Sequence, residues 1–229
     1  MEAEEQFLSL SSLICEPVRA KMLWNLLDGR AYTATELALV ADVSTTSASN
    51  HLMKLLQADM IKVDIQGRHR YYAFARPEVA YAVESLASLA SGMNSNKTRK
   101  EETVKGIRFC RSCYDHLAGS VGVQFTEALE RKTYIKKTTE REYSVSKKGW
   151  NWLSQIEISE ANFTNTRRPL ARQCLDWTER KPHLAGQLGA ALLQKMFERK
   201  WLRKTQFSRE LLVTAKGQQE LNALLGIRV

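Results

Sequence analysis

Cysteines and histidines suited to chemistry are concentrated in the second half of this sequence. Cys110 and Cys113 form a Cys-x-x-Cys pair, with Arg108 and Arg111 close by. On a helix, positions i and i+3 share one face, and neighbouring cations lower the pKa of a thiol. Such a pair could be oxidised or form a disulfide. We therefore consider a thiol redox switch at this pair, with two buried helix thiols as the alternative.

An internal repeat duplicates part of this pattern. Residues 111–115 match 172–176, and the second copy then inserts six residues. Further matches place two His-Leu-Ala-Gly motifs, starting at His116 and His183, at equivalent positions. The copies run from about 108 to 158 and from about 169 to 227. We expect each to fold as helix, helix, strand, turn, strand and helix, and the pair to form one pseudo-symmetric domain.

Each histidine of the repeat follows a Cys-x-Asp motif, which favours a pocket shared by the two copies. Small residues around Gly122 and Gly189 predict that the two helices bearing them cross closely, with the histidines at the ends of the contact. A regulatory ligand is expected near that seam. The alternative is a core hydrogen bond preserved by duplication. The candidate sensor residues are Cys110, Cys113, His116, Cys174 and His183.

Composition limits the class of protein. The chain has 229 residues, enough for two domains, and no apolar run long enough to cross a bilayer. The acidic N-terminus does not resemble a signal peptide, so we expect a cytoplasmic protein whose cysteines are thiols. Residues 1–93 carry 8 Lys and Arg against 11 Asp and Glu, whereas residues 94–229 carry 26 against 14. The basic half either contacts phosphate, produces a steering field, or is a solvated surface.

The first half contains the features expected to position a DNA-reading helix. Ser44 is a suitable N-cap, and Leu52, Leu55 and Leu56 recur at helical spacing as a core face. The opposite face carries short polar side chains suited to base edges and phosphates. The expected DNA contacts on this helix are Thr45, Thr46, Ser47, Ser49, Asn50, His51 and Lys54.

A β-hairpin is predicted directly after that helix. Residues 60–65 alternate with period two, and Gly67 marks the turn. Gln66, Arg68, His69 and Arg70 cluster at its tip, where they would meet backbone phosphates or the minor groove.

Together these motifs resemble the winged helix-turn-helix domain of the ArsR family of bacterial transcriptional repressors. The resemblance covers roughly the first 95 residues and is carried by residues 16–23, 35–38, 49–55 and 67–72. It implies a homodimer in which the first helix (4–15) and the helix beginning at Pro77 form the interface. The family's familiar metal sites are absent, because residues 33–40 contain no Cys or His and residues 77–90 no His. A novel site at Cys113, His116, Cys174 and His183 remains an alternative, and we assign no metal or cofactor.

We therefore predict a mainly α fold with small β-wings. A winged helix (1–93) and a linker (94–102) precede a C-terminal α+β regulatory domain (103–229) made of two pseudo-repeats. The expected function is sequence-specific transcriptional regulation, as a repressor released by a small-molecule or oxidant effector. The expected partners are double-stranded DNA and a second copy of the chain, with no membrane. The alternatives are a redox-sensing repressor using Cys110 and Cys113, and a sequence-independent nucleoid-type protein. No enzyme motif is found, and a thiol oxidoreductase is a weak third alternative.

Overall fold

The computed structural model describes residues 3–92, 105–139, 141–163, 168–206 and 208–229. The chain divides into two compact units, Met1–Leu86 and Ala87–Val229. The expected linker at 94–102 lies outside the described residues, and the domain limits stay a prediction. Within the described ranges, no helix has the length and apolarity that crossing a membrane requires.

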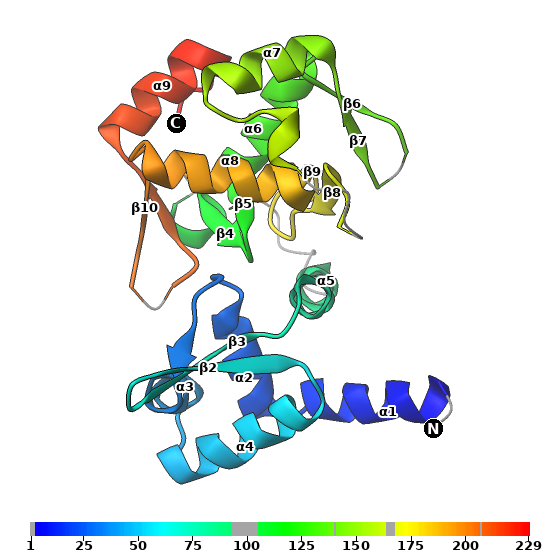
Figure 1. The fold of residues 1–229 in the computed structure, drawn as a ribbon, viewed down its shortest axis with the longest axis vertical. Helices are drawn as coiled ribbons and strands as arrows, with labels where there is room; N and C mark the ends of the chain where they lie inside the picture. The colour runs from blue at the N-terminus through cyan, green and yellow to red at the C-terminus, as the bar shows by residue number, and fades with distance from the viewer. Residues whose placement is uncertain (1–2, 93–104, 140, 164–167, 207) are drawn as a thin grey trace. The chain divides into compact units, whose positions relative to one another are not determined.

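The N-terminal unit is a winged helix-turn-helix, as the sequence predicted (Figure 1). Its three strands form an antiparallel sheet in the order β1-β3-β2. The helix α1 contributes no buried residue, whereas α2, α3 and α4 surround a core of leucines. The elements are α1 (Ala3–Ile14), α2 (Pro17–Leu26), β1 (Tyr32–Thr33), α3 (Ala34–Ala41), α4 (Thr45–Gln57), β2 (Ile61–Gln66), β3 (His69–Phe74) and α5 (Pro77–Gly92).

Side-chain caps fix where the helices of this unit begin. The Glu16 carboxylate accepts hydrogen bonds from two backbone N–H groups at the start of α2. Thr33 and Glu36 form a reciprocal capping box on α3, and the Ser44 hydroxyl accepts from the Ser47 N–H at 3.2 Å. Asp42 ends α3 in the left-handed conformation, with φ 58°. This tight turn sets the direction in which α4 leaves.

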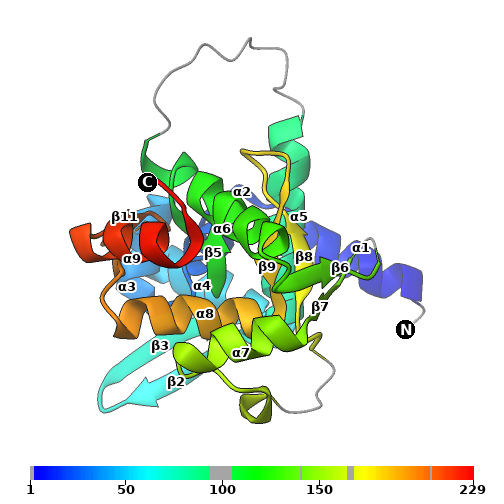
Figure 2. The same ribbon diagram turned by 90° about the horizontal axis from the view of Figure 1, so that it is seen from above.

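The C-terminal unit repeats one order of elements: hairpin, helix, hairpin, helix. Figure 2 shows α6 and α8 on either side of strands β5 and β9. The first copy comprises β4 (Arg111–Cys113), β5 (His116–Ala118), α6 (Gly119–Arg131), β6 (Ile135–Lys137), β7 (Tyr143–Val145) and α7 (Lys147–Gln155). The second comprises β8 (Arg172–Leu175), β9 (Pro182–Ala185), α8 (Gly186–Glu198), β10 (Leu202–Lys204), β11 (Leu211–Val213) and α9 (Ala215–Leu225). Two 3₁₀ turns, Gly106–Arg108 and Glu160–Asn162, complete the unit.

The prediction of a helix at the start of each copy is wrong, because each copy begins with a β-hairpin. In the first copy Cys113 faces His116 in antiparallel register across a two-residue turn, in which Tyr114 adopts φ 57°. The strand Arg111–Cys113 is buried at all three positions. It therefore lacks the alternation of buried and exposed residues by which a strand is recognised in sequence.

The two copies exchange hydrogen bonds between their hairpins. The Ser112 N–H donates to the Arg209 carbonyl at 2.9 Å, and the Leu211 N–H donates to the Cys110 carbonyl at 2.9 Å. In the other direction, the N–H groups of Gln173 and Tyr143 donate to the carbonyls of Arg141 and Ala171, at 2.8 and 3.0 Å. Each opening hairpin therefore extends the closing hairpin of the other copy, over one shared hydrophobic core.

Gly122 and Gly189 were predicted to let helices α6 and α8 cross closely, but in the structure they make room for a different contact. A Cβ atom at Gly122 would lie 2.6 Å from the Leu117 carbonyl oxygen, and one at Gly189 would lie 2.6 Å from the Leu184 oxygen. These glycines admit the backbone of the preceding hairpin, not the opposite helix. The two helix faces still line one small cavity. The helices α6 and α8 also pack on strands of the opposite copy, β9 and β5 respectively.

Candidate functional site

The predicted DNA-reading face of α4 is exposed to solvent. Ala48, Leu52 and Leu55 are buried on the opposite side of the helix. Ser49 donates a hydrogen bond to the Thr45 carbonyl at 2.9 Å, which holds its hydroxyl against the helix. Ser47 is half-buried, and the predicted contacts Thr45, Thr46, Ser49, Asn50 and Lys54 are exposed.

His51 differs from the other predicted contacts on α4. Its Nδ1 atom lies 3.2 Å from a carboxylate oxygen of Glu16 and 3.5 Å from Nη1 of Arg19. The imidazole is half-buried in this polar cluster between α4 and the start of α2. The contact gives His51 a role in positioning α4, whatever part it takes in binding DNA.

The wing carries two arginines at or beside its tip. The register pairs Gln66 with His69 and leaves Gly67 and Arg68 as a two-residue turn. Gly67 adopts φ +60°, which suits glycine at the first turn position of a hairpin. Arg70, the second cation, lies in β3 beside the turn, and all these tip residues are exposed.

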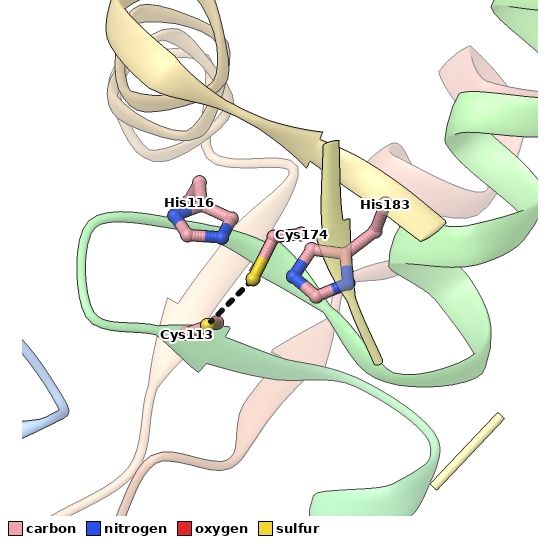
Figure 3. Close-up of side chains that lie close together, drawn as sticks. All are labelled: Cys113, His116, Cys174 and His183. Atoms are coloured by element: carbon pink, nitrogen blue, oxygen red, sulfur yellow. Dashed lines mark hydrogen bonds between the residues drawn. The ribbon is translucent and has the colours of Figure 1, made fainter. Parts of the chain in front are cut away.

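A second site lies in the C-terminal unit, where two cysteines and two histidines converge. Their ligand atoms all lie within 4.8 Å of one another. Each opening hairpin supplies one cross-strand pair, Cys113 with His116 and Cys174 with His183. Figure 3 shows the four side chains meeting between the hairpins, with the two sulfur atoms 3.8 Å apart. The structure thus brings together four of the five predicted sensor residues, and it does so at equivalent positions of the repeat.

The imidazoles of this cluster are buried with ring nitrogens unsatisfied. The two rings stack with centroids 5.0 Å apart, and each histidine is at most 1% exposed. His116 Nε2 and both ring nitrogens of His183 have no hydrogen-bond partner of normal geometry among the described residues. Burial opposes protonation of His116, but the charges of Cys113 and Asp115 raise its pKa to about 9.

Two aspartates lie behind the histidines. Asp115 Oδ1 is 3.2 Å from Nδ1 of His116, and Asp176 Oδ2 is 3.6 Å from Nδ1 of His183. Arg168 binds Asp115 at 2.7 Å, and Arg111 binds Asp176 at 2.8 Å in a fully buried pair. Burial alone would raise the pKa of Asp176, but the adjacent Arg111 guanidinium lowers it below its ordinary range. Neither aspartate was among the predicted site residues, although each stands two residues after its cysteine.

Cys110 does not belong to the cluster. It is fully buried in the hydrophobic core, and burial raises the pKa of its thiol to about 12. The one-helix arrangement expected for Cys110 and Cys113 is wrong, since Cys113 lies in β4 and Cys110 precedes that strand. The sulfur neighbour of Cys113 is Cys174, from the other copy.

A winged helix with an exposed polar reading helix is the fold of a helix-turn-helix regulator. A comparison with protein-family models found no match. The chain is 38% identical to the uncharacterized HTH-type transcriptional regulator YdfF of Bacillus subtilis (strain 168), over 96% of this chain and 97% of that protein. The chain therefore belongs to the family of HTH-type transcriptional regulators, and the predicted class of function is confirmed.

Solved structures match the N-terminal part. The homodimeric winged helix-turn-helix domain of Mb0332 from Mycobacterium bovis, a possible ArsR-family regulator, is 18% identical. It covers 42% of this chain and 89% of that chain, with a TM-score of 0.38. The repressor PagR of Bacillus anthracis is 24% identical, covers 37% and 95%, and has a TM-score of 0.33.

Proposed function

We propose that this regulator is a homodimeric, sequence-specific DNA-binding repressor whose C-terminal unit responds to an effector. The observation that carries the proposal is the solvent-facing polar side of α4 beside an exposed basic wing. Exposed short side chains can reach base edges in a major groove, and cations at the hairpin tip can reach the adjacent phosphates. Half of the Lys and Arg residues of the N-terminal unit lie on α4 or the wing, namely Lys54, Lys62, Arg68 and Arg70.

Exposed apolar side chains support a dimer. Phe7 and Leu8 on α1 are 68% and 59% exposed, and Leu86 on α5 is 45% exposed. Large apolar side chains on two helices of one small unit favour burial against a partner. The solved Mb0332 domain is described as homodimeric. A two-fold dimer would present two copies of α4 to half-sites about one helical turn apart.

The experiment compares DNA binding by the full chain on two kinds of fragment. One is the promoter region beside the regulator's own gene, and the other is the same fragment with its base order scrambled. At physiological salt we expect at least about a thousandfold preference for the promoter. Equal affinity for both fragments would instead identify a sequence-independent DNA-binding protein. Sedimentation of the free protein tests the dimer separately.

A further inference from the structure

We propose that Cys113, His116, Cys174 and His183 bind one thiophilic divalent cation, with Zn²⁺ as its representative, between the two copies of the C-terminal repeat. This site lies outside the winged helix and does not depend on DNA binding. Its failure would leave the DNA-binding proposal intact, and the reverse also holds.

The spacing of the sulfur atoms fits tetrahedral coordination. Zinc–sulfur bonds of about 2.3 Å at the tetrahedral angle hold two thiolates roughly 3.8 Å apart. The Cys113 and Cys174 sulfur atoms are 3.8 Å apart. Two imidazoles bound at about 2.0–2.1 Å would have ring centres roughly 5 Å apart, and the observed distance is 5.0 Å. The two sulfur atoms are therefore already spaced for one ion, and the full set of ligand atoms, which lies within 4.8 Å, would have to contract by up to about 1 Å around it.

The unsatisfied nitrogens point to a ligand. A buried polar atom without a partner is rare in folded proteins and calls for an explanation such as a bound ion. Nε2 of His116 and Nε2 of His183 are two such atoms, on side chains at least 99% buried. A metal bond to each Nε2 would satisfy both. The other nitrogen of each ring, Nδ1, would then remain directed to an aspartate.

The aspartates match the supporting layer of a metal site. A ligating histidine commonly donates its second N–H to a carboxylate, which fixes the tautomer and orients the ring. Asp115 is placed for this, at 3.2 Å from Nδ1 of His116, whereas Asp176 lies 3.6 Å from Nδ1 of His183 and would have to move slightly closer to accept a hydrogen bond. Each carboxylate is held in turn by an arginine, Arg168 or Arg111. The supporting carboxylate is thus in place behind His116 and stands close to its position behind His183.

The ligand types select the class of metal. Two thiolates and two imidazoles suit Zn²⁺ and exclude a preference for Mg²⁺ or Ca²⁺, which take oxygen ligands. Two thiolates also balance the charge of a divalent ion. A disulfide between Cys113 and Cys174 is the competing arrangement, but it would use only the sulfur atoms and leave both Nε2 atoms buried without partners. Cys174 is half-buried, whereas the other three ligands are buried. A metal ion would therefore enter the site from the side of Cys174.

The test is a Co²⁺ titration of the reduced, metal-free full chain, followed by displacement with Zn²⁺. We expect one equivalent per chain, the visible absorption of tetrahedral Co²⁺ and a near-ultraviolet thiolate-to-cobalt band. Zinc should also protect two thiols per chain from a thiol reagent. These readouts require neither DNA nor a variant.

Variants assign the ligands. Cys174→Ser changes the most accessible ligand and should weaken Zn²⁺ binding at least about a hundredfold, with loss of the thiolate band. Cys15→Ser is the matched control, because Cys15 is exposed in the N-terminal unit. It should leave both affinity and spectrum unchanged. Cys113→Ser and His183→Asn should resemble Cys174→Ser wherever circular dichroism shows a folded protein.

Three results would overturn the proposal. The first is reduced wild-type protein that takes up no stoichiometric Co²⁺. The second is an octahedral Co²⁺ spectrum without a thiolate band, which marks an adventitious site. The third is protection of the same two thiols without metal, with peptide mapping locating a Cys113–Cys174 disulfide.

Discussion

The sulfur atoms of Cys113 and Cys174 lie 3.8 Å apart, although 61 positions separate the two residues in the chain. Each is in register with a histidine across its own hairpin. The repeat therefore does more than duplicate a structural unit. It places one thiol and one imidazole from each copy at a common point, so that each copy supplies half of a four-ligand set.

Replacing Asp115 should weaken the proposed metal site without removing a ligand. Asp115→Asn would take away the carboxylate that orients His116, and loss of such support commonly lowers metal affinity about 10–100-fold. Competition for Zn²⁺ with a chromophoric chelator measures the change. Asp64→Asn, on the exposed wing, is the control and should have no effect. An unaltered affinity in Asp115→Asn, with thermal stability also unaltered, would exclude this role.

The buried pair of Arg111 and Asp176 should be a strong determinant of stability. Both side chains are fully buried, and Asp176 also accepts a hydrogen bond from the Gly119 N–H at 2.7 Å. Asp176→Ala leaves the guanidinium buried without its counter-charge, which should lower the free energy of unfolding by about 3–5 kcal/mol. Urea denaturation measures this. Lys181→Ala, which removes an exposed pair with Glu127, is the control and should change little.

The wing arginines should contribute to DNA affinity without sequence preference. The double variant Arg68→Ala with Arg70→Ala should weaken binding to all fragments and flatten the plot of log affinity against log salt by up to about two units. Arg76→Ala is the control for loss of a cation away from the tip, because Arg76 lies beyond β3 and is paired with Asp59. If the double variant keeps the wild-type slope, the wing does not contact phosphate.

Asn50 should read a base. It is exposed on α4, and an asparagine amide can bind adenine through two hydrogen bonds. Asn50→Ala should relax the preference at one symmetric pair of operator positions, costing about 1–3 kcal/mol of discrimination. Sites selected from random DNA by each protein provide the measurement. If the variant and the wild type select the same sites, Asn50 does not contribute to base recognition.

If the site of Cys113, His116, Cys174 and His183 is the regulatory one, metal binding there should weaken DNA binding by the winged helix. This prediction rests on both proposals. Occupying the site with Zn²⁺ should lower affinity for the promoter by at least about fivefold, within the usual range of allosteric coupling. Fluorescence anisotropy with Zn²⁺ and with chelator measures the difference. Cys174→Ser should bind DNA equally in both conditions. Equal affinity of the wild type in both conditions would leave the site a structural one.

The winged helix could be predicted because its signals are local. The N-cap at Ser44, the capping box of Thr33 with Glu36 and the glycine turn at Gly67 each depend on a few neighbouring residues. The internal repeat could also be predicted, because it is found by comparing the sequence with itself. It paired Cys113 and His116 with Cys174 and His183, and the structure brings these four side chains together.

The opening hairpins could not be predicted, for a physical reason. In the first copy, strand β4 is buried at every position and shows no alternation, and the Cys-x-x-Cys spacing suggested a helix instead. In the second copy, strand β8 is half-buried at three positions and exposed at the fourth, so it shows no alternation either. The pair of Arg111 and Asp176 is likewise invisible in sequence, since its partners are 65 positions apart and belong to different copies. The prediction that Cys110 pairs with Cys113 was wrong for the same reason, because it assumed a helix. Cys110 instead precedes strand β4, and its side chain lies in the hydrophobic core.

The exchange of hydrogen bonds between hairpins has a consequence for synthesis of the chain. Strand β4 leaves the ribosome early but finds its neighbour only when Leu211 and the rest of β11 have been made. Until then one edge of the first hairpin stays open, and an open edge is a template for pairing with other chains. A nascent or prematurely ended chain is thus exposed to aggregation through β4 until β11 has been made and has paired with it.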